Sequence, residues 1–327
     1  MKYRRLGNSG LKVSEIGLGS WLTNGDAESI HKAYDLGINF FDTANEYSQG
    51  EAEKFIGKTL SNYPRESYVL ATKVYFPMGP GPNDYGLSRK HIIEQCNASL
   101  KRLGVDYIDL YQCHRFDEET PLEETLSALN DLIQQGKILY YGVSQWNTTQ
   151  ITDAVHITEE RKLNPIISNQ PVYNMLVRDI EKEVIPVSKQ NGISQIVFSP
   201  LAQGILTGKY KPNQKSPVNS RAEKGHINYL MKSYLDDDVL RKVSELDNLA
   251  SNAGIKLSQL AIAWILRQPN ISSAITGASS ASQVEENVKA AEIKLTDDLF
   301  DEVTPILNEI ERILPAWVDP TRDFLIK

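Results

Sequence analysis

Short apolar runs alternate with amphipathic stretches along almost the whole chain. Most of the runs are apolar at nearly every position, which is typical of strands that are buried on both faces of a parallel sheet. Ahead of them, the segments KYRRL and LKVSEI flank a polar turn at residues 7–10, and this pattern predicts a β-hairpin. The remaining runs predict eight strands, at residues 15–19, 38–43, 67–73, 107–113, 139–144, 166–170, 195–199 and 273–277.

The segments between the strands carry signals for helix ends. Ser88 can cap a helix that runs through IIEQCNASLKRL, and Gly104 can end it. Pro121 can open the helix LEETLSALNDLIQQ, and Gly136 can close it. Most strands begin about 30 residues after the previous one, which is the length of a strand–helix–strand unit. Such units, joined by right-handed crossovers, form either a closed barrel or a doubly wound sheet.

Two observations favour the barrel. Eight is the number of strands that closes one. A doubly wound dinucleotide-binding sheet requires a G-x-G-x-x-G fingerprint, whereas the segment GLGSWL (17–22) lacks both the third glycine and the acidic residue that should follow. We therefore expect an α/β fold in which residues 1–327 form a single domain, a (β/α)8 TIM barrel with an N-terminal β-hairpin.

The regular alternation of strands and helices is interrupted after the seventh strand of the predicted barrel. There the chain carries the polar segment KYKPNQKSPVNSRAEKGH, followed by helices predicted at 236–253 and 258–267. A long polar loop inside a compact domain is usually functional or disordered. The family resemblance carried by the motifs below implies that this loop takes part in binding a cofactor.

The composition is that of an ordinary globular protein, with 41% hydrophobic and 24% charged residues. The net charge of −7 argues against nucleic acid or an anionic membrane surface as a partner, and an anionic cofactor would need local basic residues. No segment approaches the ~20 consecutive apolar residues of a membrane-spanning helix, and the start of the chain lacks the apolar core of an export signal. We therefore expect a cytoplasmic protein without membrane insertion.

The two cysteines, Cys96 and Cys113, fall in a helical pattern and a strand pattern, and no CxxC or mixed Cys/His spacing accompanies them. A zinc site or a disulfide framework is therefore not expected, and no residue is assigned as a metal ligand. Free cysteine prefers protein interiors, so buried packing is the expected role of both residues.

Four polar side chains near the ends of separate apolar runs are the candidate catalytic groups. Asp42 closes the segment NFFD, Lys73 closes YVLATK, and His114 closes IDLYQCH. Tyr47 follows Asp42 by five positions. In a (β/α)8 barrel the C-terminal strand ends surround one mouth, where active sites lie. A phenol, an ammonium, a carboxylate and an imidazole that converge there can deliver a proton to a carbonyl oxygen.

Eight longer stretches match a known family in order and spacing: GLGSW (17–21), NFFDTANEY (39–47), ATK (71–73), LKRLGVDYIDLYQCH (100–114), GKILYYGVSQW (136–146), NQPVYN (169–174), FSPLAQGILTGKY (198–210) and ITGASSASQVEEN (275–287). Through them the chain resembles the aldo-keto reductase superfamily along nearly its whole length. The segments SPLAQGILTGKY, SRAEKG and GASSASQVEEN look most like the branch that contains the β-subunits of voltage-gated potassium channels and their bacterial relatives. The resemblance implies a barrel that binds NAD(P)H and reduces aldehydes or ketones to alcohols.

The resemblance also implies a role for each catalytic candidate. Tyr47 would be the general acid that protonates the nascent alkoxide, and His114 would orient the substrate carbonyl. A free tyrosine has a pKa near ~10, which is too high for an efficient acid at neutral pH. Lys73 would lower that pKa, because a neighbouring ammonium stabilises the phenolate, and Asp42 would pair with Lys73.

Cofactor contacts follow from the same resemblance. Ser144, Asn169 and Gln170 would hold the nicotinamide carboxamide, and Phe198 would stack on its ring in place of the Tyr or Trp of many relatives. Backbone N–H groups would meet the pyrophosphate, since glycine allows close approach of a backbone. The pyrophosphate contacts implied are those of Ser199, Leu201, Gln203 and Gly204.

Preference for NADPH is implied by residues that match the channel-subunit pattern for the 2′-phosphate, namely Arg221, Ser279 and Gln283. A solvated loop charge would also explain Arg221, and a polar helix face would also explain residues 283–287. The other cofactor contacts implied are a positive charge from Lys209, adenine contacts from Glu286 and Asn287, and contacts from Trp21 and Gly277.

Two other functions remain open. The first is an NADPH-binding redox-sensing or regulatory subunit, which the channel-like cofactor segments support. His114, where channel β-subunits carry Asn, and the lack of an extension before the barrel favour an enzyme instead. The second is a barrel hydrolase with paired carboxylates such as Asp42 and Glu46, which leaves Lys73 unexplained. Trp21 and the loop 75–86 are expected to line the substrate side, but the sequence selects no particular small carbonyl compound and leaves the oligomeric state unknown.

Overall fold

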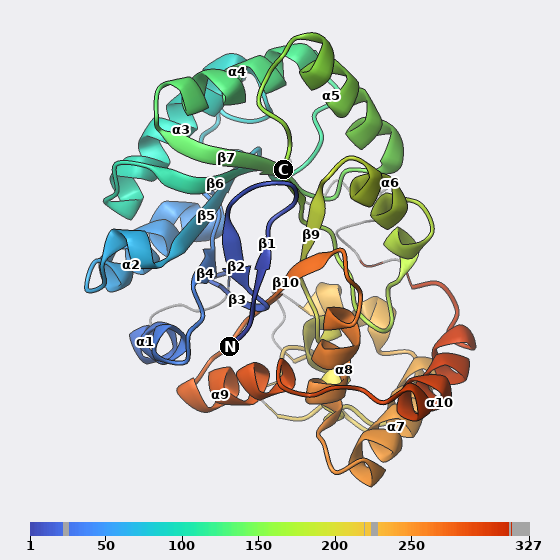
Figure 1. Cartoon of the computed structure of the whole chain (residues 1–327). Helices are drawn as coiled ribbons and strands as arrows, with labels where there is room; N and C mark the ends of the chain where they lie inside the picture. Colours follow the sequence, from blue (N-terminus) through green and yellow to red (C-terminus); the bar gives the residue numbers. More distant parts are fainter. Residues whose placement is uncertain (22–25, 219, 224–227, 314, 316–327) are drawn as a thin grey trace.

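Eight parallel strands close into a barrel in the computed structural model, which describes residues 1–21, 26–218, 220–223, 228–313 and 315 (Figure 1). Each strand lies within or overlaps one of the apolar runs, so the predicted (β/α)8 barrel is confirmed. The strands close in the order β10-β3-β4-β5-β6-β7-β8-β9. Their bounds are β3 (Ile16–Gly19), β4 (Phe40–Asp42), β5 (Val69–Val74), β6 (Ile108–Cys113), β7 (Ile138–Val143), β8 (Ser168–Asn169), β9 (Ser194–Val197) and β10 (Ile271–Thr276).

Helices surround the strands on the outside of the barrel (Figure 1). The described α-helices are α1 (Ala27–Asp35), α2 (Glu51–Leu60), α3 (Arg89–Leu103), α4 (Leu122–Gln134), α5 (Thr148–Glu160), α6 (Val184–Gln190), α7 (Asp237–Asn252), α8 (Leu257–Leu266), α9 (Ala281–Ala290) and α10 (Asp297–Asn308). Short 3-10 helices occur at η1 (Tyr47–Gly50), η2 (Arg65–Ser67), η3 (Asp179–Glu181), η4 (Ala202–Thr207) and η5 (Asn228–Tyr234).

The predicted helix ends are largely where the sequence places them. The hydroxyl oxygen of Ser88 accepts a hydrogen bond from the backbone N–H of His91 at 3.2 Å, which caps α3. Gly104 follows α3 with φ +67°, and Gly136 follows α4 with φ +68°. Both adopt the left-handed backbone that glycine accepts at a helix end without strain. Pro121 immediately precedes α4 instead of forming its first residue.

A hairpin formed by β1 (Tyr3–Arg5) and β2 (Lys12–Ser14) lies across the barrel end that is nearer the viewer (Figure 1). The side chains of Leu6 and Val13 are fully buried. They pack in one cluster with barrel residues that include Phe40, Leu110 and Ile196. The hairpin therefore closes the N-terminal end of the barrel, and the opposite end is left for chemistry.

Arg4 fastens this hairpin to the last helix–strand unit of the barrel. Its Nε lies 2.7 Å from Oε1 of Glu15. Its Nη1 donates to the backbone oxygen of Ile271 at 2.7 Å, and its Nη2 donates to that of Leu266 at 2.7 Å. Because the carbonyls at the end of a helix have no partner within the helix, this guanidinium also caps α8.

Cys96 and Cys113 are buried free thiols, as expected from the sequence. Burial raises the pKa of both thiols, to about 12 for Cys96. The reactive thiolate form is therefore suppressed, and the two residues serve packing.

The two helices predicted after the seventh barrel strand are present as α7 and α8. Residues 219 and 224–226 of the preceding polar segment lie outside the described residues. Among the described residues, no single helix is long and apolar enough to span a membrane. The pair α7 and α8 together reaches that length and apolarity, but the two helices are bent by 91° relative to each other.

Substituting Gly57 tests the packing of α2 on α3. A Cβ atom at this position would lie 2.7 Å from Cα of Leu103 and still closer to the carbonyl oxygen, and this backbone cannot move aside cheaply. Alanine normally stabilises a helix relative to glycine, but here we expect Gly57→Ala to destabilise the fold by about 2–4 kcal/mol. Urea unfolding would measure it. The matched control is Gly10→Ala, where a Cβ meets no atom within 4 Å and little change is expected.

Candidate active site

The four catalytic candidates meet at the C-terminal end of the barrel. Asp42 ends β4, Lys73 lies near the end of β5, and His114 directly follows β6. The ammonium of Lys73 donates to Oδ2 of Asp42 at 2.5 Å and to the backbone oxygen of Thr43 at 2.8 Å. It also lies 3.5 Å from the hydroxyl of Tyr47, which is 26 positions away in the chain. The fold therefore brings the phenol and the amine into contact.

Two glutamines fix the second oxygen of Asp42. Oδ1 of Asp42 accepts a hydrogen bond from Nε2 of Gln112 at 3.2 Å and another from Nε2 of Gln170 at 2.9 Å. Lys73 is fully buried and Asp42 is nearly so. A buried ion pair is tolerated only when further hydrogen bonds satisfy its remaining atoms, and these amides supply them.

An unusual turn positions Tyr47 over Lys73. Ser48 and Gln49 have φ of 50° and 54°, and Gly50 has φ of 89°. Left-handed backbone at residues other than glycine is strained and is found mainly where the surrounding structure imposes it, often at functional sites. The ring centroid of Tyr47 lies 5.1 Å from the ammonium of Lys73, so the turn holds the phenol at the mouth.

His114 is enclosed by aromatic rings. Its ring centroid lies 5.7 Å from that of Tyr47 and 4.8 Å from that of Phe76, both in edge-to-face geometry. Burial lowers the pKa of His114 well below its ordinary value, and the positive charges of Lys73 and Arg115 lower it further. The imidazole is therefore neutral at physiological pH. A neutral imidazole donates one hydrogen bond, which suits the orientation of a carbonyl oxygen better than the donation of a proton.

The prediction that Lys73 lowers the pKa of Tyr47 is wrong for the protein without a bound cofactor. Burial raises this pKa well above its ordinary value, the carboxylates of Asp42 and Glu46 raise it further, and Arg115 opposes them. Lys73 cannot reverse the effect because its ammonium is paired with Asp42 at 2.5 Å. Burial also lowers the pKa of Lys73, against the opposing effect of Asp42. The phenol therefore keeps its proton.

Two charged residues beside the four candidates were not singled out by the sequence as parts of the reductase site. Burial raises the pKa of Glu46 to about 7, against the opposing charges of Lys73 and Arg115. Nη1 of Arg115 donates to the backbone oxygen of His114 at 2.7 Å. The available signal was adjacency in the chain, since Glu46 precedes Tyr47 and Arg115 follows His114.

Residues predicted to hold a nicotinamide carboxamide lie at the same end of the barrel. Ser144 follows β7, Asn169 ends β8 and Gln170 follows it. The hydroxyl of Ser144 donates to the backbone oxygen of Gln170 at 2.8 Å, and the side-chain N–H of Gln170 is used by Asp42. Oδ1 of Asn169 is buried without a hydrogen-bond partner among the described residues. An unpaired buried acceptor fits the N–H donors of a carboxamide.

The segment after β9 has an unusual, largely left-handed backbone. Phe198 follows the strand, and Ser199, Ala202 and Gln203 then have φ of 54°, 46° and 59°. Gly204 has φ of 98°, a value at which glycine is strongly preferred. The backbone N–H groups of Ala202 and Gly204 donate to the backbone oxygens of Ser199 and Leu201, at 3.0 and 2.8 Å. The contacts of this segment with a pyrophosphate stay predictions.

Two cations adjoin this loop. A Cβ atom on Gly204 would lie 3.5 Å from Nζ of Lys209, so the lysine approaches the turn closely. Arg221 donates to Oε1 of Gln203, whose Nε2 donates in turn to the hydroxyl of Ser199 at 2.7 Å. Lys209 and Arg221 thus lie beside this segment, and their contacts with a cofactor stay predictions. Leu201, which precedes the left-handed residues, is only partly buried.

The remaining residues predicted to contact the cofactor make separate contacts in the structure. Oε1 of Gln283 accepts from the backbone N–H and the hydroxyl of Ser279, at 3.0 and 3.3 Å. Glu286 instead pairs with Lys256 at the surface, and Asn287 is buried in α9. Two further residues follow barrel strands: Trp21, which is 37% exposed after β3, and Gly277, where a Cβ would meet no described atom within 4 Å.

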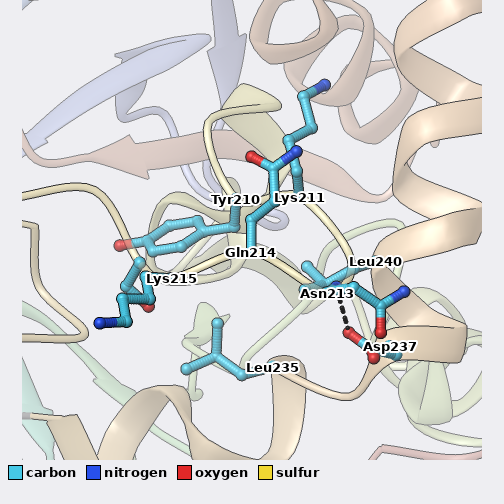
Figure 2. Close-up of a pocket in the computed structure, with 9 residues that line it drawn as sticks. Tyr210, Lys211, Asn213, Gln214, Lys215, Leu235, Asp237 and Leu240 are labelled. Atoms are coloured by element: carbon cyan, nitrogen blue, oxygen red, sulfur yellow. Dashed lines mark hydrogen bonds between the residues drawn. The ribbon is translucent and has the colours of Figure 1, made fainter.

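A small pocket of about 190 Å³ lies between the chain that follows this segment and the start of α7, and it is distinct from the mouth (Figure 2). It is lined by residues 210, 211 and 213–216 and by Leu235, Asp237 and Leu240. The backbone N–H of Asn213 donates to Oδ1 of Asp237 at 3.0 Å, which is the dashed line in Figure 2. Lys211 is paired with Asp247 at 3.1 Å. These contacts fasten the loop to α7, and the pocket contains none of the four catalytic candidates.

Comparison with protein families agrees with this geometry. The model of the aldo/keto reductase family matches residues 15–308. The chain belongs to the aldo/keto reductase family. Membership supports oxidoreductase activity, and residues 15–308 include all four catalytic candidates.

Individual relatives within the family carry two kinds of name. A probable voltage-gated potassium channel subunit beta of Arabidopsis thaliana is 44% identical over 327 residues, which cover 97% of each chain. A putative subunit of the same kind from Schizosaccharomyces pombe is 43% identical, over 94% of this chain and 93% of its own. The L-glyceraldehyde 3-phosphate reductase of Escherichia coli (strain K12) is 37% identical, over 89% of this chain and 87% of its own. The predicted resemblance to the channel-subunit branch is thereby confirmed.

The raised pKa of Glu46 makes a prediction for stability. A carboxyl whose pKa is higher in the folded than in the unfolded state destabilises the fold progressively as pH rises between about 4.5 and 7. Glu46→Gln removes this effect. We expect the gain in the free energy of unfolding of the variant over the natural protein to be about 1–3 kcal/mol larger at pH 8 than at pH 5, which means that the variant is relatively more stable at pH 8.

Urea unfolding at both pH values would measure this difference. The control is Glu66→Gln at an exposed glutamate, which reports the effect of losing a surface charge. An equal effect of Glu46→Gln at pH 5 and pH 8 would contradict the prediction.

Proposed function

We propose that this protein reduces small aldehydes or ketones to alcohols with NADPH, and that Tyr47 donates the proton. The observation that carries the proposal is the 3.5 Å contact between the hydroxyl of Tyr47 and the ammonium of Lys73, beside the neutral imidazole of His114. Family membership supports the oxidoreductase class. The cytoplasmic location and the single-domain organisation stay predictions.

The arrangement of the side chains suggests a separate role in the reduction for each residue. Bound NADPH would supply the hydride. His114 would donate a hydrogen bond to the carbonyl oxygen and thereby fix its direction. Tyr47 would keep its proton until the oxygen becomes an alkoxide, because burial holds its pKa high while an alkoxide is a stronger base still. Lys73 would then stabilise the phenolate at short range.

The cofactor is inferred from the fit of three groups of residues. The unpaired oxygen of Asn169 suits the carboxamide, and the positive charge of Lys209 beside the turn at Gly204 suits the pyrophosphate. Arg221 would meet the 2′-phosphate that distinguishes NADPH from NADH, because a guanidinium binds phosphate in a bidentate manner.

The names of the relatives favour a second candidate function. The plant and yeast relatives are named as subunits of voltage-gated potassium channels. A protein of that kind could use the same barrel as an NADPH-binding regulatory or redox-sensing subunit. His114 favours the enzyme. A steady rate of NADPH consumption with a panel of aldehydes would support the enzyme, and a single burst limited to one turnover would support the sensor.

Removing the phenolic hydroxyl tests the assignment of the proton donor. We expect Tyr47→Phe to lower kcat for aldehyde reduction by about 10²-fold or more, since it deletes the general acid. NADPH affinity, measured by quenching of protein fluorescence, should stay within a few-fold. The control is Tyr3→Phe, in the hairpin at the opposite end of the barrel, where the hydroxyl donates to the backbone oxygen of Gly37 at 2.9 Å. Undiminished turnover by Tyr47→Phe would refute the assignment.

Removing the guanidinium tests the choice of cofactor. We expect Arg221→Ala to weaken NADPH by about 10-fold or more and NADH only slightly, because charge-assisted hydrogen bonds to the 2′-phosphate are lost. Dissociation constants for both cofactors would be measured by titration. Arg241→Ala, at a surface ion pair with Asp238, is the matched control. Equal weakening of both cofactors would rule out the 2′-phosphate role.

A further inference from the structure

Arg115 holds a guanidinium at the wall of the mouth beside the catalytic groups. It is the residue after His114, and its Nη1 donates to the backbone oxygen of His114 at 2.7 Å. Its guanidinium carbon lies 5.4 Å from the ring centroid of Phe76, and the Phe76 ring is in edge-to-face contact with His114. The guanidinium is therefore tethered on two sides to the wall that holds the imidazole.

The charge of Arg115 has no matching ion pair. Across the described residues, no carboxylate oxygen lies within 4.0 Å of its guanidinium nitrogens, whereas Arg4, Arg65 and Arg102 each have such a partner. An arginine has five N–H donors, and the backbone oxygen of His114 takes one direct hydrogen bond. The side chain as a whole is partly exposed.

The field of this guanidinium reaches the reacting groups. Arg115 lowers the pKa of Tyr47 and of His114. The groups whose charges act on Arg115 in turn are Tyr47, Glu46 and Tyr75. Burial lowers the pKa of Arg115 itself, so holding this charge at the mouth has a desolvation cost. Partly desolvated cations without an internal partner are characteristic of binding sites for anions. A guanidinium matches carboxylate and phosphate groups in geometry as well as in charge.

We propose that Arg115 binds an anionic group, a carboxylate or a phosphate, on the carbonyl substrate, and that the carboxylate of Glu46 opposes this binding. The inference rests on the proposed reductase function and narrows its substrate class to anionic aldehydes and ketones. Arg115 is a specificity residue in this scheme. The reacting carbonyl lies with Tyr47 and His114, and the anionic end of the substrate extends along the wall toward Arg115.

Glu46 gives this preference a dependence on pH. The groups that face it are Lys73 from β5, Arg115 after β6, Tyr47 in the same turn and Tyr229 from η5. Its pKa is raised to about 7, so its negative charge is largely absent below pH 7 and present above it. A negative charge there repels an anionic substrate and weakens the pull of Arg115. Preference for a carboxylate substrate, whose own charge is constant over this range, should therefore fall as pH rises from 6 to 8.

The test compares two matched pairs of substrates. One pair is 4-carboxybenzaldehyde and 4-methylbenzaldehyde, and the other is glyceraldehyde 3-phosphate and glyceraldehyde. The measured quantity is the ratio of kcat/KM for the anionic member to that for the neutral member. A variant that damages the site in general lowers kcat/KM for both members of a pair and leaves this ratio unchanged. Comparing the two pairs shows whether the site prefers a carboxylate or a phosphate.

We expect Arg115→Met to lower the ratio about 10-fold or more for at least one pair, because the charge-assisted hydrogen bonds to the anion are lost. Arg115→Lys should retain part of the preference through its charge. Glu46→Gln should raise the ratio at pH 8 and abolish its decline between pH 6 and pH 8. The control is Arg89→Met at a surface ion pair with Asp131, which should leave the ratio unchanged.

An unchanged ratio in Arg115→Met, or an equal loss for both members of each pair, would overturn the inference while leaving the reductase function intact. If the natural protein reduces no aldehyde, the proposed function fails separately. Binding then decides the inference: isothermal titration with benzoate and with inorganic phosphate should show a site that Arg115→Met weakens about 10-fold or more and Arg89→Met leaves intact. Equal affinities in the natural protein and Arg115→Met, or no binding, would overturn it.

Discussion

The buried pair of Lys73 and Asp42 is the interaction on which the mouth of the barrel depends. Removing two charges from water costs several kcal/mol for each ion, and a pair survives burial only if its other atoms are also satisfied. Here the ammonium donates to Thr43, and the second carboxylate oxygen accepts from Gln112 and Gln170. Taking away one partner would leave an uncompensated buried charge, at a cost of about 3–5 kcal/mol.

Barrel closure makes this network possible. The residues that build it come from β4, β5, β6 and the end of β8, which are distant in sequence but end at one opening because all the strands are parallel. The hairpin closes the other end with Leu6 and Val13, and Arg4 secures it. The interior is thus packed at one end, while polar groups occupy the other.

Charges at the mouth act as a set, and burial decides their protonation. Desolvation keeps the proton on Tyr47, keeps His114 neutral and raises the pKa of Glu46 to about 7. Lys73 was expected to acidify the phenol of Tyr47, but its ammonium is paired mainly with Asp42. It lies 2.5 Å from the carboxylate oxygen and 3.5 Å from the phenol oxygen, and electrostatic attraction is stronger at the shorter distance. Arg115 donates to the backbone oxygen of His114 and forms no ion pair within 4.0 Å among the described residues, which is why we propose it as the group that binds an anion.

The sequence by itself determined the eight strands, the hairpin, the caps at Ser88 and Gly104 and the convergence of the four catalytic candidates, because periodicity and turn residues act locally and parallel strands share an exit. Only the tertiary structure decided which charges face one another. It turned the backbone left-handed at Ala202 and Gln203, paired Glu286 with Lys256, and reversed the expected shift of Tyr47. The reason is that burial and electrostatic fields depend on everything packed around a group, and those neighbours come from distant parts of the chain.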